Sequence, residues 1–259
     1  MIDTATTEPA ADAAPYRRLR TANLGMGSLH AVQAVLILVL ANAFALPVTA
    51  SFMTGPPGST PEPPTTLFEI PTAWAVAAFF VLSALAHFLV AAPGINSWYV
   101  ENLRHGRNYA RWIEYSLSSS LMIVLIAQLT GITDVAALIA LFGVNASMIL
   151  FGLLQEHDHE PGGSLLPFWL GCIAGIVPWV AITVYALSPG LTGTPPAFVI
   201  AIFISLFAFF NCFALVQWAQ YKPVGRYRNY LTGERTYIVL SLVAKSALAW
   251  QVFSATLAG

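Results

Sequence analysis

Residues 236–253 read TYIVLSLVAKSALAWQVF, and this stretch decides the class of protein. Lys245 lies in its middle, between two runs of apolar or small residues, and no other basic side chain of the chain lies so deep in an apolar segment. A charged lysine at the centre of a membrane helix costs roughly 2.5–3.5 kcal/mol on insertion scales. That cost predicts a functional role, because a lysine amine in an apolar site can form a Schiff base with an aldehyde.

The composition is that of a membrane protein. Hydrophobic residues make up 57% of the 259 residues and charged residues only 9%, against about 25% charged in a typical soluble domain. Seven apolar stretches are long enough to cross a bilayer as helices. We therefore predict an all-α membrane protein, a bundle of seven transmembrane helices. The predicted spans are residues 22–46, 71–92, 108–130, 134–154, 164–187, 196–220 and 235–257.

Lysine and arginine residues predict the orientation of this bundle. Ten of the eleven lie before the first predicted span, between or at the ends of the second and third, or between the sixth and the start of the seventh. Because cytoplasmic loops of membrane proteins are enriched in Lys and Arg, we expect a multi-pass protein of the cell membrane with a cytoplasmic N-terminus and an external C-terminus. The ten residues are Arg17, Arg18, Arg20, Arg104, Arg107, Arg111, Lys222, Arg226, Arg228 and Arg235.

The segments outside the spans are few. Residues 1–21 are predicted to form a disordered cytoplasmic tail, and residues 22–257 the bundle. The external segment 47–70 contains six prolines, which exclude a helix but leave room for a small hairpin. No motif predicts a catalytic site, a metal site or binding of nucleic acid. Lipid is the expected surrounding.

Glu114 is the candidate partner of Lys245, because it is the only carboxylate that the sequence places well inside a span. It lies in RWIEYSLSSS, residues 111–120 of the third predicted helix, which runs in the same direction as the seventh. One cation and one anion in a low-dielectric bundle are expected to pair. Ser118 and Ser241 lie one turn from these two residues and are suited to bond with the pair. The alternative is an ion pair with a purely structural role.

Two histidines lie within the first two predicted spans. His30 and His87 are in the half of the bundle predicted to be cytoplasmic, at a level comparable with Glu114, and Gln33 and Ser83 lie one turn away. A histidine inside a membrane often serves only as a contact between helices. Two histidines at one level beside a charge pair also suit a group that accepts protons.

The combination of these features resembles the heliorhodopsins, which are retinal-binding proteins of inverted orientation. The matching residues are SLVAKSALAW at 241–250, RWIEYSLSSS at 111–120, and the pair His30 and His87. The resemblance covers the whole bundle and implies a rhodopsin-like fold. It also implies that all-trans-retinal is bound covalently to Lys245.

Further roles follow only from this resemblance. Glu114 would be the counterion of a protonated Schiff base, and His30, His87 and Gln33 would form the proton-accepting region. The loop 47–70 would take part in a homodimer. The residues implied to lie around the chromophore are Ser241, Ser118, Ser83, Tyr115, Asn145, Trp169, Phe209, Phe210 and Gln217. From the sequence alone, aromatic residues in such helices are more often part of an ordinary bundle core than of a cofactor site.

Three functions remain open from the sequence. A light sensor with local proton transfer is favoured, because we find no second carboxylate in the middle of a helix for a transport relay. The cytoplasmic loops 155–163 and 221–235 carry opposite charges. They would offer a docking surface to a signalling partner, which the sequence does not identify. The second function is a light-driven proton or ion transporter on the same scaffold. The third is a transporter or scaffold without retinal.

Overall fold

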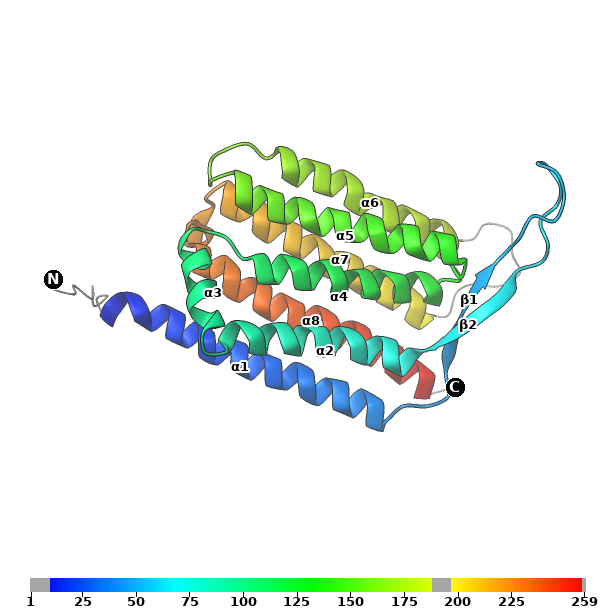
Figure 1. Ribbon diagram of the computed structural model, residues 1–259, viewed down its shortest axis with the longest axis horizontal. Helices are drawn as coiled ribbons and strands as arrows, with labels where there is room; N and C mark the ends of the chain where they lie inside the picture. The colour runs from blue at the N-terminus through cyan, green and yellow to red at the C-terminus, as the bar shows by residue number, and fades with distance from the viewer. Residues whose placement is uncertain (1–9, 188–196, 258–259) are drawn as a thin grey trace.

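The computed structural model describes residues 10–187 and 197–257. Within these ranges, seven helices are long and apolar enough to cross a membrane, and they lie side by side as a bundle (Figure 1). The prediction of an all-α membrane bundle is confirmed. The seven helices are α1 (Ala10–Val39), α2 (Thr72–Ala91), α4 (Tyr109–Leu129), α5 (Val135–Asp158), α6 (Leu166–Leu187), α7 (Ala197–Tyr221) and α8 (Tyr230–Leu257).

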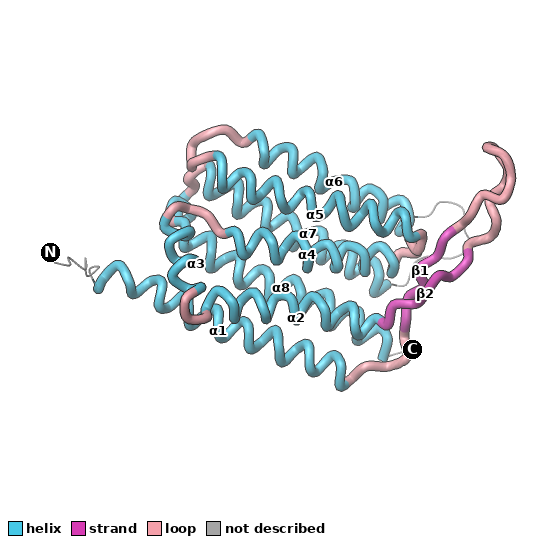
Figure 2. The backbone as a smooth tube through the Cα atoms, in the orientation of Figure 1, coloured by secondary structure: helices cyan, strands magenta, loops and turns pink. Residues whose placement is uncertain are grey.

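Shorter elements distinguish the two ends of the bundle. The short helix α3 (Ile95–Arg104) and the 3-10 turn η1 (Gly225–Arg228) lie at the same end of the bundle as the start of α1, which we call the N-terminal face (Figure 1). Strands β1 (Ala45–Ala50) and β2 (Thr65–Pro71) project from the other end, which we call the hairpin face (Figure 2). Helices α4 and α8 both run from the N-terminal face to the hairpin face.

The prediction of a disordered tail over residues 1–21 is wrong for its second half. Helix α1 begins at Ala10, whereas residues 1–9 lie outside the described part of the chain. The segment from Ala10 is rich in alanine, the residue that favours helix most strongly. Leu19 is also buried, in a small cluster with Tyr99 of α3 and Ile238 of α8. The helix therefore gains both local propensity and packing.

The first predicted span, residues 22–46, is also placed too late. Helix α1 ends at Val39, and residues 45–50 form β1, which pairs with β2 as an antiparallel hairpin with an irregularity between Val48 and Thr49. The side chain of Thr49 bonds with that of Thr133 at 3.0 Å, which ties the hairpin to the connection between α4 and α5. The hairpin that the proline-rich segment allowed is present.

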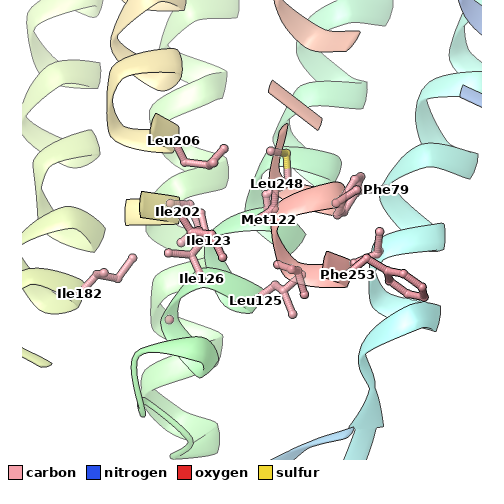
Figure 3. Packing of buried hydrophobic residues seen from close by; sticks show 14 of the residues in the cluster. Phe79, Met122, Ile123, Leu125, Ile126, Ile182, Ile202, Leu206, Leu248 and Phe253 are labelled. Carbon is pink, nitrogen blue, oxygen red and sulfur yellow. The ribbon is translucent and has the colours of Figure 1, made fainter. Parts of the chain in front are cut away.

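The buried apolar and the buried ionisable side chains are distributed differently between the two halves of the bundle. The largest apolar cluster occupies the half near the hairpin face (Figure 3). In contrast, every buried residue with an ionisable acid or base in the described chain, tyrosines aside, lies in the middle or near the N-terminal face. These residues are His30, Arg111, Glu114, Glu156, Glu234 and Lys245. Among the described residues, the buried acids and bases are thus absent from the half near the hairpin face.

Candidate functional site

Lys245 of α8 and Glu114 of α4 form the buried ion pair that the sequence predicted. The Lys245 Nζ donates to Glu114 Oε1 at 3.0 Å and to Ser241 Oγ, one turn earlier on α8, at 2.9 Å. The two charged side chains are only 4% and 8% exposed. Because each charge has lost its water, both depend on this contact for their stability in the bundle.

Two further side chains complete the surroundings of the pair. Ser83 of α2 donates from Oγ to Glu114 Oε1 at 2.7 Å, so this carboxylate oxygen receives bonds from two helices. The Lys245 Nζ also lies 5.2 Å from the centre of the Tyr115 ring, within the range of a cation–π contact. The Tyr115 hydroxyl donates to the backbone oxygen of Tyr237 at 2.9 Å, which holds the ring in place. The site is therefore assembled by α2, α4 and α8.

A large cavity begins at this lysine and extends between α4, α5, α6, α7 and α8. Its empty volume is about 790 Å³, including its open mouth. Apolar and aromatic side chains make up most of its wall, with a few polar groups, as is usual for sites that bind small molecules. Its lining residues are Trp112, Tyr115, Ser118, Ser119, Met122, Met148, Ile149, Gly152, Phe168, Gly171, Cys172, Phe210, Phe213, Ala214, Gln217, Ser241, Ala244 and Lys245.

Five of the residues predicted for the chromophore wall line this cavity. They are Tyr115, Ser118, Phe210, Gln217 and Ser241. Gln217 is held by a bond from its Nε2 to the backbone oxygen of Gly152 at 3.0 Å. The Oγ of Ser118 is buried without a hydrogen-bond partner among the described residues, so a polar group in the cavity would find a free hydroxyl there.

Three predicted wall residues lie elsewhere. Trp169 is 54% exposed on the outside of the bundle and Phe209 is only partly buried; in each case the neighbouring residue in the sequence lines the cavity instead. Consecutive helical residues point about 100° apart, so an error of one position moves a side chain out of the wall. Asn145 donates from Nδ2 to Ser119 and Ser120, behind the cavity, and orients hydroxyls of α4.

The two histidines lie beside the ion pair and contact each other. Their rings stack with centres 5.5 Å apart. His87 Nδ1 lies 2.7 Å from Asn23 Oδ1. Both ring nitrogens of His30 are buried without a partner among the described residues. Buried polar atoms in that condition usually bond with internal water.

Gln33 has a different neighbour from the one predicted. Its Oε1 accepts a hydrogen bond from Trp250 Nε1 of α8 at 3.1 Å, and not from a histidine. This bond connects α1 to α8, and neither residue lines the large cavity.

A second buried charge cluster was missed by the sequence analysis. Arg111 of α4 forms ion pairs with both Glu156 of α5 and Glu234 of α8, and all three side chains are almost completely buried. The sequence analysis assigned Glu156 and Glu234 to charged loops, because each lies near the end of an apolar run. In the structure α5 extends beyond Glu156 to Asp158, and α8 already begins at Tyr230, before Glu234. In the sequence, the polar residues Asn108 and Trp112 on either side of Arg111 were the signal that could have indicated this cluster. Both bond with Glu156 in the structure.

We compared the chain, with its lysine in an apolar cavity, with known protein families. A model of the heliorhodopsin family matches residues 19–257. The chain belongs to the heliorhodopsin family.

The fold of this heliorhodopsin is also similar to a solved structure. The crystal structure of cyanorhodopsin N4075R from the cyanobacterium Tolypothrix sp. NIES-4075 superposes with a TM-score of 0.62, at 13% identity and over 96% of each chain. At this identity the likeness shows the fold alone. No curated protein sequence matches the chain.

Family membership implies retinal bound to a lysine, and the residues of this heliorhodopsin fit that group. Lys245 is the only lysine of the chain inside a span. Its amine reaches the wall of a cavity whose volume and apolar lining suit a polyene, and aromatic rings such as those of Tyr115 and Phe210 border it. The family thus supports a photoreceptor-type protein containing retinal, rather than a transporter without it.

Proposed function

We propose that this heliorhodopsin is a light sensor that signals through a conformational change instead of pumping ions. Retinal, in its all-trans form in the dark, is linked to Lys245 Nζ as a protonated Schiff base and supplies the absorption of visible light. The observation that carries this proposal is the 3.0 Å contact of Lys245 Nζ with Glu114, at the wall of the apolar cavity.

The side chains around Lys245 Nζ hold its positive charge. Glu114 acts as the single carboxylate counterion, and the hydroxyl of Ser83 bonds to the same oxygen. Ser241 is the second hydrogen-bond partner of the nitrogen and contributes a neutral hydroxyl. Since one acid neutralises one base in a low-dielectric site, the dark state is stable with the proton on the nitrogen.

Proton transfer after illumination is local. His87 and His30 lie in the same half of the bundle as Glu114, and their neutral rings offer a nitrogen with a free lone pair for a proton released from Lys245 Nζ. The unpartnered nitrogens of His30 support this role, because they would bond with internal water able to carry a proton.

The division of the bundle favours sensing over pumping. A pump requires ionisable groups from one face to the other. Within residues 10–187 and 197–257, the core towards the hairpin face is made of apolar side chains such as Phe79, Ile126 and Phe253 (Figure 3). The proton that leaves Lys245 would therefore return from the same side.

We further propose that the N-terminal face is cytoplasmic, since ten of the eleven lysines and arginines lie at or near it. A signalling partner would then dock at this face, around α3 and η1. For the opposite face we propose a homodimer contact through the hairpin, where Phe52, Leu67 and Phe68 are exposed.

Reconstitution with retinal tests the chromophore. Expressed protein given all-trans-retinal should develop a visible absorption band, and Lys245→Ala should not. Lys222→Ala is the matched control, because Lys222 is the other lysine of the chain and is exposed. Colourless wild-type protein, or an equal band in Lys245→Ala, would refute the chromophore site.

A second experiment separates sensing from transport. Cells or vesicles containing the pigment are illuminated while external pH is recorded. A sensor should produce no pH change that an uncoupler abolishes. A sustained change that the uncoupler removes would establish the alternative, a light-driven proton transporter.

A further inference from the structure

The buried cluster of Arg111, Glu156 and Glu234, which we call the triad, joins three helices near the N-terminal face. One guanidinium faces two carboxylates, so the triad carries an excess negative charge when all three groups are ionised. Glu156 also accepts bonds from Trp112 Nε1 at 2.7 Å and from the Asn108 backbone at 3.0 Å. A site with so many bonds to α4, α5 and α8 is sensitive to any change in one of them.

Asn23 of α1 is the first connection between this triad and the retinal site. Its Nδ2 donates to the backbone oxygen of Leu19 at 3.0 Å, so its Oδ1 is free to accept. His87 Nδ1, 2.7 Å from that oxygen, must then carry the hydrogen. Consequently Nε2 is the His87 nitrogen with the free lone pair, the atom that can receive a proton.

Tyr99 of α3 is the second connection. Its hydroxyl donates to Glu234 Oε1 at 3.0 Å, and the same oxygen accepts from Asn108 Nδ2. Burial and the charge of Glu234 raise the pKa of Tyr99 well above its ordinary value. Tyr99 and Asn23 line the same small cavity. Tyr99 is therefore a permanent donor, positioned between Asn23 and Glu234.

A small cavity contains both ends of this connection. Its empty volume is about 360 Å³, including its open mouth. The residues of its wall that matter here are Glu114, His87, Asn23, Tyr99, Arg111 and Glu234.

We propose that the triad is a second functional site, whose hydrogen bonding changes after illumination because Asn23 and Tyr99 couple Glu234 to His87. This inference rests on the proposed function, since it requires a proton to reach His87.

The coupling needs no transfer of a proton to the triad. A proton from Lys245 Nζ binds His87 Nε2, and the resulting cation donates more strongly through Nδ1–H to Asn23 Oδ1. This bond polarises the Asn23 amide, and internal water in the small cavity that Asn23 and Tyr99 both line would carry the change to the Tyr99 hydroxyl. The Tyr99 O–H then donates more strongly to Glu234 Oε1, which weakens the attraction of Glu234 for Arg111. The contact of α8 with α4 is altered at the face where a partner would bind.

Infrared difference spectra of the retinal-loaded protein, dark against illuminated, test the coupling. We expect a carboxylate band that appears together with loss of the proton from Lys245 Nζ and that Glu234→Gln removes. Tyr99→Phe and Asn23→Leu should also remove it. In Tyr99→Phe the visible absorption band should be unchanged, which shows that the variant is folded. The matched controls are Tyr109→Phe, at the start of α4, and Asn96→Leu, on α3, both of which should retain the band.

The outcomes separate this inference from the proposed function. Coloured protein that transfers its proton but shows no Glu234 band overturns the coupling alone, as does a Glu234 band that persists in Tyr99→Phe and in Asn23→Leu. Protein that forms no visible band, or never loses the proton from Lys245 Nζ, overturns the coupling and the proposed function together.

Discussion

Lys245 Nζ and Glu114 Oε1 lie 3.0 Å apart, although 131 positions separate the two residues in the chain. Helices α4 and α8 run in the same direction, and each contributes one charge at the same depth of the bundle. Ser83 and Ser241 supply hydroxyls to the two partners. The pair therefore has the minimum composition of a chromophore site, with one base, one acid and neutral groups around them.

Glu114→Gln should shift the visible band of the retinal-loaded protein strongly to longer wavelength. Loss of the negative charge reduces the energy that favours a positive charge localised at the nitrogen, so excitation requires less energy. Absorption spectra of the purified variant measure the shift. Glu101→Gln, at an exposed acid of α3, should leave the band in place, and an unshifted Glu114→Gln spectrum would remove the counterion role.

Arg111→Met should destabilise the protein more than Glu234→Gln. The first change leaves two buried carboxylates without a cation and should cost about 3–5 kcal/mol. The second leaves one ion pair intact and should cost about 1–3 kcal/mol for the bonds that it loses. Thermal unfolding in detergent, with the exposed Arg228→Met as control, provides the comparison. Equal losses would show that the triad is not a buried charge network.

Gly152→Ala should disturb both the cavity and the triad. A Cβ at Gly152 would lie 2.6 Å from the Trp112 ring, which lines the cavity and bonds to Glu156. We expect a lower yield of pigment and a displaced visible band. Gly143→Ala on the same helix is the control, because a Cβ there meets nothing within 4 Å. Identical pigment from both variants would contradict this packing.

Asp134→Ala should weaken the start of α5. The Asp134 side chain accepts bonds from the backbone nitrogens of Ala136 and Ala137 at 3.0 and 3.1 Å, as a helix N-cap. Its loss should cost about 1 kcal/mol, measured as a lower temperature of thermal unfolding. Asp134→Asn retains a capping oxygen, so its unfolding temperature should be close to that of the wild type. If Asp134→Asn is as unstable as Asp134→Ala, the capping role is contradicted.

Tyr99 should make stability fall at high pH. Its pKa in the folded protein is well above the ordinary value of 10, because of burial and the charge of Glu234. The stabilisation is complete below the unfolded pKa of about 10 and is lost as pH rises towards the folded pKa. Unfolding temperatures measured between pH 8 and pH 11 (roughly one unit above that pKa) should therefore fall more steeply for wild type than for Tyr99→Phe. Parallel curves would exclude the linkage.

The number of spans and the Lys245–Glu114 pair could be predicted because they depend on local properties. Apolar length determines which segments cross a bilayer. The high cost of an isolated charge makes two opposite charges in neighbouring helices meet. The helix ends were less accurate: α1 begins at Ala10 because alanine propensity and the packing of Leu19 extend it beyond its apolar part.

The wall of the cavity was predicted only in part. Tyr115, Phe210 and Gln217 line it, but Trp169 and Phe209 do not, because one residue of helical phase turns a side chain from the interior to the exterior. Hydrophobicity gives little help here, since lipid and cavity are both apolar. The orientation of an aromatic side chain in such a helix depends on its neighbours.

By itself, the sequence determined seven membrane helices and one buried base with its acid, since both follow from what a bilayer permits. Only the tertiary structure decided that Glu156 and Glu234 enclose Arg111, and that Asn23 and Tyr99 lie between this triad and His87. These contacts join residues from six helices, and no local pattern encodes them. They depend on the packing angles and depths of whole helices, which side chains far along the chain determine together.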